Sequence, residues 1–310
     1  MSKKAKVIFV GNYKGGVGKT TTALYLSTWI SKIKNSNNEN NKVLVIDLDP
    51  QSSLSEILVS NNRDKNYQYD SKLSNVPDDH TVNFIYDISI RVIKKYHSFV
   101  PNFLNVPIKY RDNDSDFWFV PCSIYYKSEN STIGVGLDDI IQLMDDNLQY
   151  YQILPNFLNS LKDNFDYIII DCPPTNNIIT SSTFLASDWY VIPTICDGLS
   201  SNGVIHYIQK IKQIYKKMCI DSVDADINRL LFGNEPNCAG IFYNLIRAQA
   251  KYVIEKDYLK SELASKFNYK DLIYDEIINN YVDIARKTPR GIAESPDFKA
   301  IVDKIYERIK

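Results

Sequence analysis

The clearest chemistry in this chain is carried by a loop of lysine and glycine near the N-terminus. Residues 14–21 (KGGVGKTT) closely follow the apolar run 7–10. They nearly fit the phosphate-binding pattern G-x-x-x-x-G-K-[ST], in which Gly18, Lys19 and Thr20 are the last three residues. In such a loop a buried strand turns into a helix, and backbone N–H groups at the helix N-terminus hold phosphate oxygens. The pattern therefore predicts that Lys19 contacts nucleotide phosphates and that the Thr20 hydroxyl ligates Mg²⁺.

A second lysine, Lys14, lies at the mouth of the same loop, and Tyr13 occupies the position of the first glycine. One cation is enough for a phosphate loop, so Lys14 is either solvated, paired with an acid or used for another nucleotide. The pattern K-G-G-x-G-K-[ST] resembles the deviant Walker A box of the ParA and MinD superfamily of ATPases, which also accounts for Tyr13. By this resemblance Lys14 reaches across a dimer interface to the partner's phosphates, so that ATP is sandwiched between two chains. The resemblance also implies that ATP and Mg²⁺ are the cofactors, with nucleotide contacts from Gly15, Gly16, Val17, Gly18, Lys19, Thr20 and Thr21.

Two later segments extend the resemblance. Residues 43–51 (VLVIDLDPQ) are similar to the second box of the superfamily, and residues 165–174 (FDYIIIDCPP) are similar to its Walker B strand. Asp171 ends a buried strand and is expected to hold Mg²⁺ through a water, although such a carboxylate can instead cap the following turn. The resemblance assigns the attacking water to Asp49 and leaves Asp47 to orient the metal shell or the loop. These two residues would share a face if the strand continued, which leaves their division of roles open.

The composition agrees with a single large domain, because the chain has 310 residues, of which 44% are hydrophobic and 24% are charged. Strand-like and helix-like segments alternate, which is typical of parallel strands joined by crossover helices. Strands are expected at 6–10, 43–46, 118–120, 168–170, 190–192 and 239–243, and the first helix at 20–34. We predict a doubly wound, mostly parallel α/β sheet with helices on both faces, of the phosphate-loop NTPase class. The candidate catalytic groups should then meet at the carboxyl edge of the sheet.

Two regions depart from this simple alternation. The region at about 61–116 is rich in Asn, Asp and Tyr, and within it residues 81–95 have near-helical apolar spacing. We interpret it as a helical excursion with long loops, packed on the main sheet, and as a surface insertion rather than a functional element. A C-terminal helical region is expected at about 245–310. Its last part, 297–310, is amphipathic, and we interpret it as a packed closing helix rather than the membrane helix of MinD relatives.

Charge and cysteine content argue against several classes of protein. The formal net charge is -1, so any nucleic-acid surface must be local. The five cysteines include no C-x-x-C pair, which argues against both a disulfide framework and a zinc site. No apolar run approaches the length of a membrane span, and the first strand begins too early for a signal peptide. A cytoplasmic, nucleoid-associated protein without a membrane partner is expected.

Candidate contacts to DNA and adenine depend on the resemblance. ParA relatives bind duplex DNA nonspecifically, as ATP dimers, through scattered basic side chains in the C-terminal third. The candidates here are Arg247, Lys251, Arg286, Lys287 and Arg290, the last three near a segment, AESP at 293–296, that is similar to the family's A-E-A-P. Lys212 and Lys216, in an acid-free run, are weaker candidates because charged runs on helices are usually solvated faces. Asn244 follows an expected strand where relatives present Asn or Thr to the base, or else it is a turn residue.

The D-L-D-P-Q and Y-I-I-I-D-C-P-P forms are more similar to ParA partition ATPases than to MinD or nitrogenase iron protein. We therefore expect an ATPase that forms an ATP-sandwich homodimer, binds nonspecific duplex DNA and is stimulated by a centromere-binding, ParB-like partner. No helix-turn-helix precedes the first strand, so centromere recognition is assigned to that partner. Two alternatives stay open. One is a MinD-like or cargo-positioning ATPase that cycles on a membrane or another cellular surface, and the other is a nucleotide-gated scaffold that scarcely hydrolyses ATP.

Overall fold

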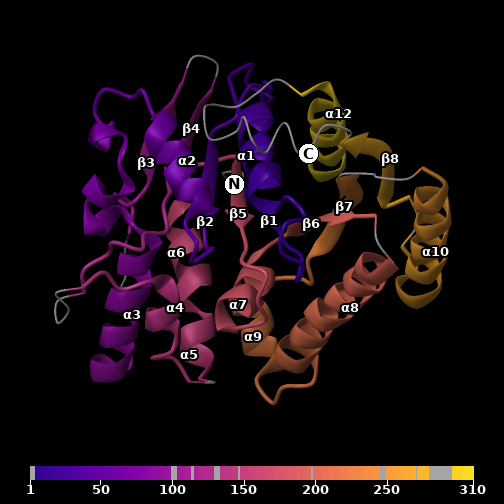
Figure 1. Cartoon of the computed structure of the whole chain (residues 1–310). Coiled ribbons are helices and arrows are strands. Elements are labelled where there is room, and N and C mark those ends of the chain that lie inside the picture. The colour runs from indigo at the N-terminus through magenta and orange to yellow at the C-terminus, as the bar shows by residue number, and fades with distance from the viewer. Residues whose placement is uncertain are drawn as a thin grey trace.

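The computed structural model describes residues 4–98, 103–112, 115–128, 133–145, 147–196, 198–244, 249–269, 271–278 and 295–310. Within them lies an eight-stranded sheet of order β3-β4-β2-β5-β1-β6-β7-β8 (Figure 1). Neighbouring strands are parallel except for β3 and β4, which are antiparallel. The strands are β1 Lys6–Val10, β2 Val43–Asp47, β3 Ile108–Arg111, β4 Asp116–Val120, β5 Tyr167–Asp171, β6 Trp189–Ile195, β7 Asn237–Asn244 and β8 Ile273–Ile278. The prediction of a mostly parallel sheet is confirmed, while β3 and β8 were not foreseen.

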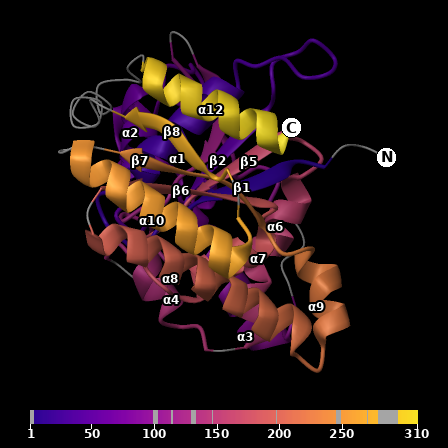
Figure 2. The same cartoon turned by 90° about the vertical axis from the view of Figure 1, so that its right-hand side faces the viewer.

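Helices cover both faces of this sheet (Figures 1 and 2). They are α1 Lys19–Ile30, α2 Ser53–Asn61, α3 Val82–Tyr96, α4 Leu137–Ile141, α5 Leu148–Tyr151, α6 Ile153–Leu161, α7 Ile178–Ala186, α8 Gly198–Tyr215, α9 Ala225–Phe232, α10 Gln249–Phe267 and α12 Pro296–Ile309. A short π-helical turn, η4 Lys216–Ile220, continues α8. Three 3-10 turns, η1 Tyr69–Ser71, η2 Leu73–Asn75 and η3 Asp78–His80, lie between α2 and α3.

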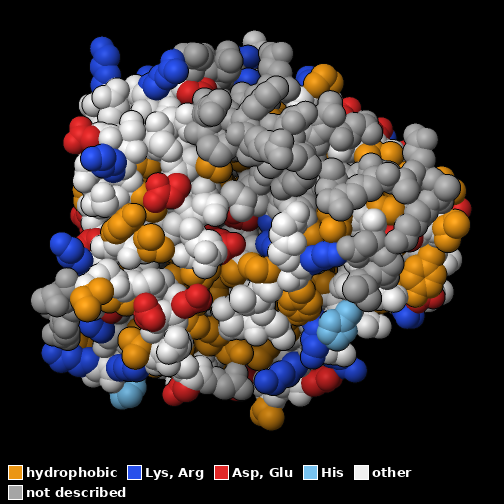
Figure 3. All heavy atoms as spheres, in the orientation of Figure 1, with side chains coloured by type: hydrophobic (Ala, Val, Ile, Leu, Met, Phe, Trp, Pro, Cys, Tyr) orange, Lys and Arg blue, Asp and Glu red, His pale blue; other side chains and the backbone are white. Residues whose placement is uncertain are grey.

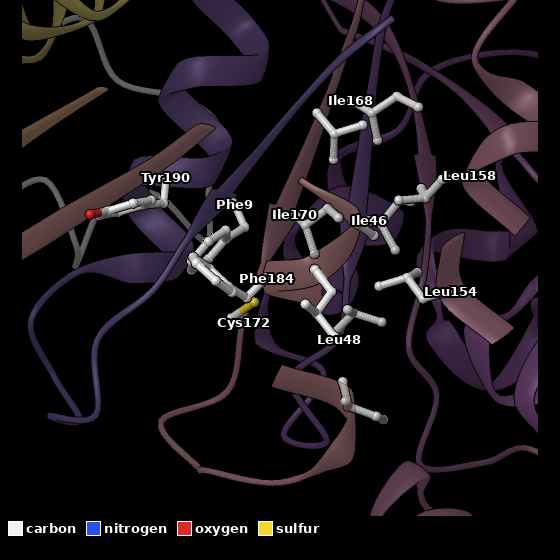
Figure 4. Packing of buried hydrophobic residues seen from close by; sticks show 14 of the residues in the cluster. Phe9, Ile46, Leu48, Leu154, Leu158, Ile168, Ile170, Cys172, Phe184 and Tyr190 are labelled. Atoms are coloured by element: carbon white, nitrogen blue, oxygen red, sulfur yellow. The ribbon is translucent and has the colours of Figure 1, made fainter. Parts of the chain in front are cut away.

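The side chains of each central strand alternate between two hydrophobic cores. Ile168 and Ile170 of β5 enter the core under α3, α6, α7 and α8, part of which is shown in Figure 4. Ile169 of the same strand enters the opposite core, under α1, α2 and α12. This alternation is the period of a strand that is buried on both faces. It explains why the central strands read as continuous apolar runs.

The closing helix α12 is part of the second core. Its apolar face, including Phe298 and Ile305, is fully buried. The Phe298 ring stacks on Tyr25 of α1, with ring centroids 4.3 Å apart. The interpretation of a packed closing helix is therefore confirmed. Among the described residues, no helix combines the length and the apolar character that a bilayer span requires.

The segment between α2 and β4 is more deeply integrated than a surface insertion. Thr81 caps α3, since its side chain accepts a hydrogen bond from Phe84 N–H, and the helix follows over nearly the expected residues. Ile85 and Ile90 of α3 enter the first core. The segment also supplies β3, the edge strand of the sheet. The expectation of a helical excursion packed on the sheet holds, but an antiparallel strand pair was missed because β3 is short.

Helix α1 ends four residues earlier than expected, at Ile30. Just past this end, the side-chain amide of Asn41 donates to the carbonyl oxygens of Ile30 and Ile33, at 3.2 and 3.0 Å. Each of these carbonyl oxygens also accepts a backbone N–H, that of Ile33 at 3.1 Å and that of Asn41 at 3.0 Å, so backbone and side-chain hydrogen bonds together hold the turn that follows α1. Asn41 ends the polar run 35–41, yet it is buried.

Candidate functional site

The phosphate loop joins the end of β1 to α1, and two of its glycines have left-handed backbone conformations. Gly16 has φ 72°, and Gly18, the N-cap of α1, has φ 91°. L side chains rarely adopt these values, so both positions favour glycine. A Cβ atom at Gly15 or Gly16 would have no heavy-atom neighbour within 4 Å. The loop backbone at these glycines therefore faces open space that a phosphate group can enter.

The carboxyl ends of three strands meet beside this loop. Val10 of β1 and Asp47 of β2 are both in register with Asp171 of β5. The expected convergence of the candidate groups on one edge is thus observed for these strands. It follows from parallel pairing, which aligns the strand ends.

Asp171 is completely buried, and neither of its carboxylate oxygens accepts a well-formed hydrogen bond. Burial, followed by the neighbouring Asp47, raises the pKa of Asp171 well above its usual range, while the Thr20 hydroxyl and Lys19 oppose this rise. A buried carboxylate without partners is costly unless a cation neutralises it. The environment of the Asp171 carboxylate therefore favours a bound cation beside it.

Asp47 is also buried, but its oxygens are occupied. One oxygen accepts from the hydroxyl and backbone N–H of Ser55, at 2.6 and 2.9 Å, and the other accepts from the backbone N–H of Asp49, at 3.0 Å. Burial raises the pKa of Asp47 to about 7 although these hydrogen bonds lower it. Ser55 in turn accepts from Cys122 N–H at 2.9 Å. Asp47 thus ties β2 to the start of α2 and to the backbone that carries Asp49.

Asp49 lies beyond the end of β2 and is half-buried. One of its carboxylate oxygens accepts from Gln51 N–H at 3.0 Å. Its charge acts on Lys19, because Asp171 and Asp49 both raise the Lys19 pKa, which burial lowers. Of the two acids in the D-L-D segment, Asp49 is the partly exposed one, and its charge acts on Lys19.

The two lysines of the loop have different partners. Lys19 is buried, and its Nζ donates to the carbonyl oxygen of Lys14 at 3.1 Å. Lys14 Nζ donates to the Ser200 hydroxyl of α8 in the same chain, at 3.0 Å. The Lys14 backbone is also held, since its N–H donates to Asn12 Oδ1 at 3.0 Å. In this conformation Lys14 lies at the loop mouth but points to its own subunit.

The described residues fit Mg²⁺ and a nucleotide as ligands. No group of three or more His, Cys, Asp or Glu that could hold a metal ion occurs in the described part of the chain. The Thr20 hydroxyl lies beside the Asp171 carboxylate, and these two groups would hold Mg²⁺, Asp171 through a water, with nucleotide phosphates and waters as the other ligands, as is usual for Mg²⁺. Thr21 and Thr22 lie in the first turn of α1, and the Thr22 hydroxyl donates to Gly18 O at 2.7 Å.

Asn244 lies at the end of β7 and is completely buried. Its Nδ2 donates to the carbonyl oxygen of Val17 at 2.6 Å, and its Oδ1 has no hydrogen-bond partner. The Asn244 side chain thus holds the phosphate loop through Val17, and its Oδ1 is a buried acceptor without a hydrogen-bond partner. The role toward adenine that was expected from the resemblance stays a prediction.

The structure places few of the DNA-contact candidates. Arg247, Arg286, Lys287 and Arg290 lie outside the described residues, and Lys251 lies in α10 with its side chain outside them. Lys212 pairs with Glu235 at 2.7 Å, and Lys216 lies 3.9 Å from Asp221. These ion pairs argue against Lys212 and Lys216 as DNA contacts. The run that contains the two lysines has no acid, but acids from other parts of the chain lie beside them. On the face drawn in Figure 3, the described basic and acidic side chains are interspersed.

Sequence reasoning missed Ser55 and Ser200. Both are buried hydroxyls whose importance depends on contacts to distant residues, Asp47 and Lys14. Ser55 had a local signal, because it follows the D-L-D-P-Q segment at the start of a helix. Ser200 had none, since 186 positions separate it from Lys14.

Comparison with known families and proteins agrees with this geometry. Residues 5–107 and 128–223, more than half of the chain, match the family described as AAA domain (AAA_31). The chain is 28% identical to the sporulation initiation inhibitor protein Soj of Bacillus subtilis over 70% of this chain and 68% of that protein. It is 24% identical to the chromosome-partitioning ATPase Soj of Treponema pallidum over 98% of this chain and 94% of that protein. Its match to two uncharacterized Pseudomonas putida proteins spans 65% of their length.

Solved structures share the fold. A complex of McdA from Cyanothece with ATP covers 99% of this chain and 96% of its own, with a TM-score of 0.65 and 18% identity. The ParA of pNOB8 bound to nonspecific DNA covers 98% of each chain, with a TM-score of 0.60 and 19% identity. A plasmid partition protein from Borrelia burgdorferi bound to AMPPNP covers 98% of each chain, with a TM-score of 0.61 and 19% identity.

Proposed function

We propose that this chain is a DNA-partition ATPase. It belongs to the AAA domain family and is a P-loop ATPase of the ParA/MinD type. In this proposal it hydrolyses ATP slowly, closes around ATP as a homodimer and binds nonspecific duplex DNA in that state. A centromere-binding, ParB-like protein stimulates hydrolysis and resets the cycle. The observation that carries the proposal is the meeting of the phosphate loop, Asp49 and Asp171 at one sheet edge.

Each group has a defined chemical task in this proposal. Phosphoryl transfer to water spreads negative charge over the γ-phosphate oxygens, and the enzyme works mainly by positioning and charge neutralisation. Lys19 and the loop N–H groups hold the phosphates, and Asp49 orients the attacking water. Asp47 fixes the backbone of Asp49 through the hydrogen bond between them. Mg²⁺, held by Thr20 and by Asp171 through a water, would neutralise charge on the phosphates.

Lys14 is proposed to complete the site in trans. Its ammonium would stabilise the partner's phosphates, as an arginine finger does, and only when two subunits close. The hydrogen bond from Lys14 to Ser200 must then break on closure. The open backbone at Gly15 and Gly16 supports this proposal, because it permits close approach of a second chain.

The DNA-binding step rests on the family and on one neighbour. The pNOB8 ParA structure contains nonspecific DNA, and backbone binding needs only a few cations on one face. We assign the DNA contacts to Arg247, Lys251, Arg286, Lys287 and Arg290. The same proposal includes the location of the protein on the nucleoid and its ParB-like partner.

A cargo-positioning ATPase is the second candidate; the McdA complex with ATP, a structure of the same fold, supports only the nucleotide site that both candidates share. It would use the same nucleotide site and differ in its partner. The membrane-cycling version of this candidate is disfavoured by α12, whose apolar face is buried in the core.

Fluorescence anisotropy with random-sequence duplex DNA tests the proposal. Binding should require ATP, ignore DNA sequence and fall steeply with added salt, because counterion release drives it. Arg290→Glu should weaken binding to all duplexes and leave ATP-dependent dimerisation intact, and Lys299→Glu on α12 is the matched charge control. Sedimentation with anionic liposomes together with no ATP-dependent DNA affinity would falsify the partition function and favour the membrane-cycling version of the second candidate.

A further inference from the structure

Helix α9 carries a patch of aliphatic side chains that the described part of the chain leaves uncovered. Val223 is 103% exposed, Leu230 is 87% exposed and Ile227 is 56% exposed. Ile227 and Leu230, three residues apart, lie on one face of α9, and Val223 lies in the turn that precedes the helix. We call Val223, Ile227 and Leu230 the α9 patch. Single exposed aliphatic residues are ordinary, but a contiguous group marks an interaction surface.

The α9 patch is presented rigidly. On the opposite side of the helix, Asn228 and Phe232 are buried. Asn228 Nδ2 donates to Met218 O at 2.6 Å, and an Arg229 guanidinium nitrogen donates to Cys219 O at 3.0 Å. These bonds anchor α9 to η4. The apolar face is therefore held outward without a change in the rest of the fold.

The α9 patch lies far from the nucleotide site along the strand direction. Helix α9 leads into Asn237, the first residue of β7, which pairs with Trp189 at the start of β6. The patch is thus near the amino edge of the sheet, whereas Asp47 and Asp171 end their strands at the carboxyl edge. Figure 2 shows α9 standing out from the body of the molecule. A partner can bind there without entering the nucleotide site.

Charges beside the patch select a second copy of the same helix as its partner. Asp226 and Arg229 are exposed and form an ion pair along one flank of the patch. If two α9 helices pack antiparallel about a twofold axis near Ile227, Val223 of one copy meets Leu230 of the other. Arg229 of one copy then approaches Asp226 of the other, twice over. A parallel arrangement would instead carry the two charged flanks to opposite sides of the contact, so that Arg229 of one copy could not reach Asp226 of the other.

The charges also argue against a lipid surface. The basic residues around the patch, Lys216, Lys217 and Arg229, are matched in number by the acids Asp221, Asp224 and Asp226. Helices that lie on anionic membranes carry an excess of Lys and Arg on the polar face. Charge balance suits a neutral, self-complementary contact.

We propose that the α9 patch is a self-association surface, through which two copies pair by antiparallel contact of their α9 helices. The contact needs no nucleotide and leaves the carboxyl edge free. It does not rest on the proposed function. Because three aliphatic side chains make a small interface, the contact should be weak and reversible.

Sedimentation equilibrium of the nucleotide-free chain tests this proposal, over a range from about 5 to 500 µM, which covers weak small-interface contacts. The wild-type chain should pass reversibly from monomer to dimer. Leu230→Glu should raise the dissociation constant at least about tenfold, because it buries a charge in the contact. Asp226→Arg should also raise it, since two arginines then face each other. Ile254→Glu replaces an exposed isoleucine of α10 and should change nothing.

ATP binding and hydrolysis should be equal in the wild-type chain and Leu230→Glu, which separates this contact from the ATP-dependent dimer. Circular dichroism and thermal unfolding check that the variants are folded. The proposal is overturned if the wild-type chain stays monomeric throughout this range, or if Leu230→Glu associates as the wild type does. It is also overturned if nucleotide-free chain sediments with phosphatidylcholine vesicles through Leu230 and does not self-associate.

Discussion

Asp47 and Asp49 stand two positions apart, yet their surroundings differ because the strand ends between them. Asp47, the last residue of β2, faces the interior and receives hydrogen bonds from Ser55. Asp49 lies in the turn that follows and stays partly exposed. The shared strand face that was considered from the spacing therefore does not exist. The buried, hydrogen-bonded Asp47 is therefore suited to hold the backbone around it, and the partly exposed Asp49 is suited to contact water.

The first prediction concerns Lys19 and Asp49. Lys19→Ala should weaken ATP binding by at least about 100-fold, since charged hydrogen bonds to phosphate contribute about 2–3 kcal/mol or more. Asp49→Ala should bind ATP normally and accumulate as an ATP dimer. Equilibrium nucleotide binding and size-exclusion chromatography with ATP and Mg²⁺ measure both effects, with the exposed Lys42 changed to Ala as control. Hydrolysis at the wild-type rate by Asp49→Ala would remove Asp49 from its assigned role.

The second prediction concerns the pH dependence of stability. The pKa of Asp47 is about 7 in the folded chain, above its ordinary value. Between these two values the folded state holds a proton that the unfolded state has lost, so Asp47 lowers the free energy of unfolding as pH rises toward 7. Asp47→Asn cannot titrate and lacks this decline.

Urea unfolding at pH 5 and pH 8, without nucleotide or Mg²⁺, measures this decline. The wild-type chain should lose up to about 2–3 kcal/mol more stability than Asp47→Asn between these two pH values. The comparison uses the change with pH, so the constant cost of the substitution cancels, and the difference reports Asp47 together with its effect on the pKa of Asp171. Equal losses in both proteins would mean that Asp47 is already ionised at pH 5.

At the scale of elements, α12 secures the face of the sheet that α1 covers. Phe298 stacks on Tyr25 and meets the edge of Phe242, with ring centroids 6.3 Å apart in the second pair. This contact joins the last helix to the helix that begins at the phosphate loop. The stability of α12 and the position of α1 are therefore linked by direct packing.

The third prediction follows from this packing. Phe298→Ala should lower the free energy of unfolding by about 3–5 kcal/mol, the usual cost of removing a buried aromatic ring. Glu307→Ala, on the exposed side of the same helix, should change it by less than about 0.5 kcal/mol. Urea unfolding measures both variants. A small effect of Phe298→Ala would show that α12 is only loosely attached in solution.

At the scale of the whole molecule, the position of Lys14 decides how two subunits cooperate. The fourth prediction is that Lys14→Ala binds ATP but loses hydrolysis and ATP-dependent dimerisation, because the facing phosphates lose a cation. Steady-state phosphate release and size-exclusion chromatography measure these losses. Normal turnover by Lys14→Ala would mean that the lysine does not act across the interface.

Mixing variants separates action in trans from action in cis. A heterodimer of Lys14→Ala and Asp49→Ala chains has one site that combines Asp49 of the first chain with Lys14 of the second. If Lys14 acts in trans, the mixture should hydrolyse ATP although each variant alone does not. If it acts in cis, mixing should restore nothing.

The sequence by itself determined the sheet core, the phosphate loop and the set of acids, because these features depend on local rules. Apolar runs predict buried strands, glycines permit the loop, and parallel strands must bring Asp47 and Asp171 to one edge. Only the tertiary structure decided the partners of these groups. Ser200 accepts from Lys14 and Asn244 donates to Val17, each across a long stretch of chain, and the buried amide of Asn41 donates to the last residue of α1. The tertiary structure also decided that β3 and β8 are strands, since each is an edge strand of the sheet and pairs with a single neighbour.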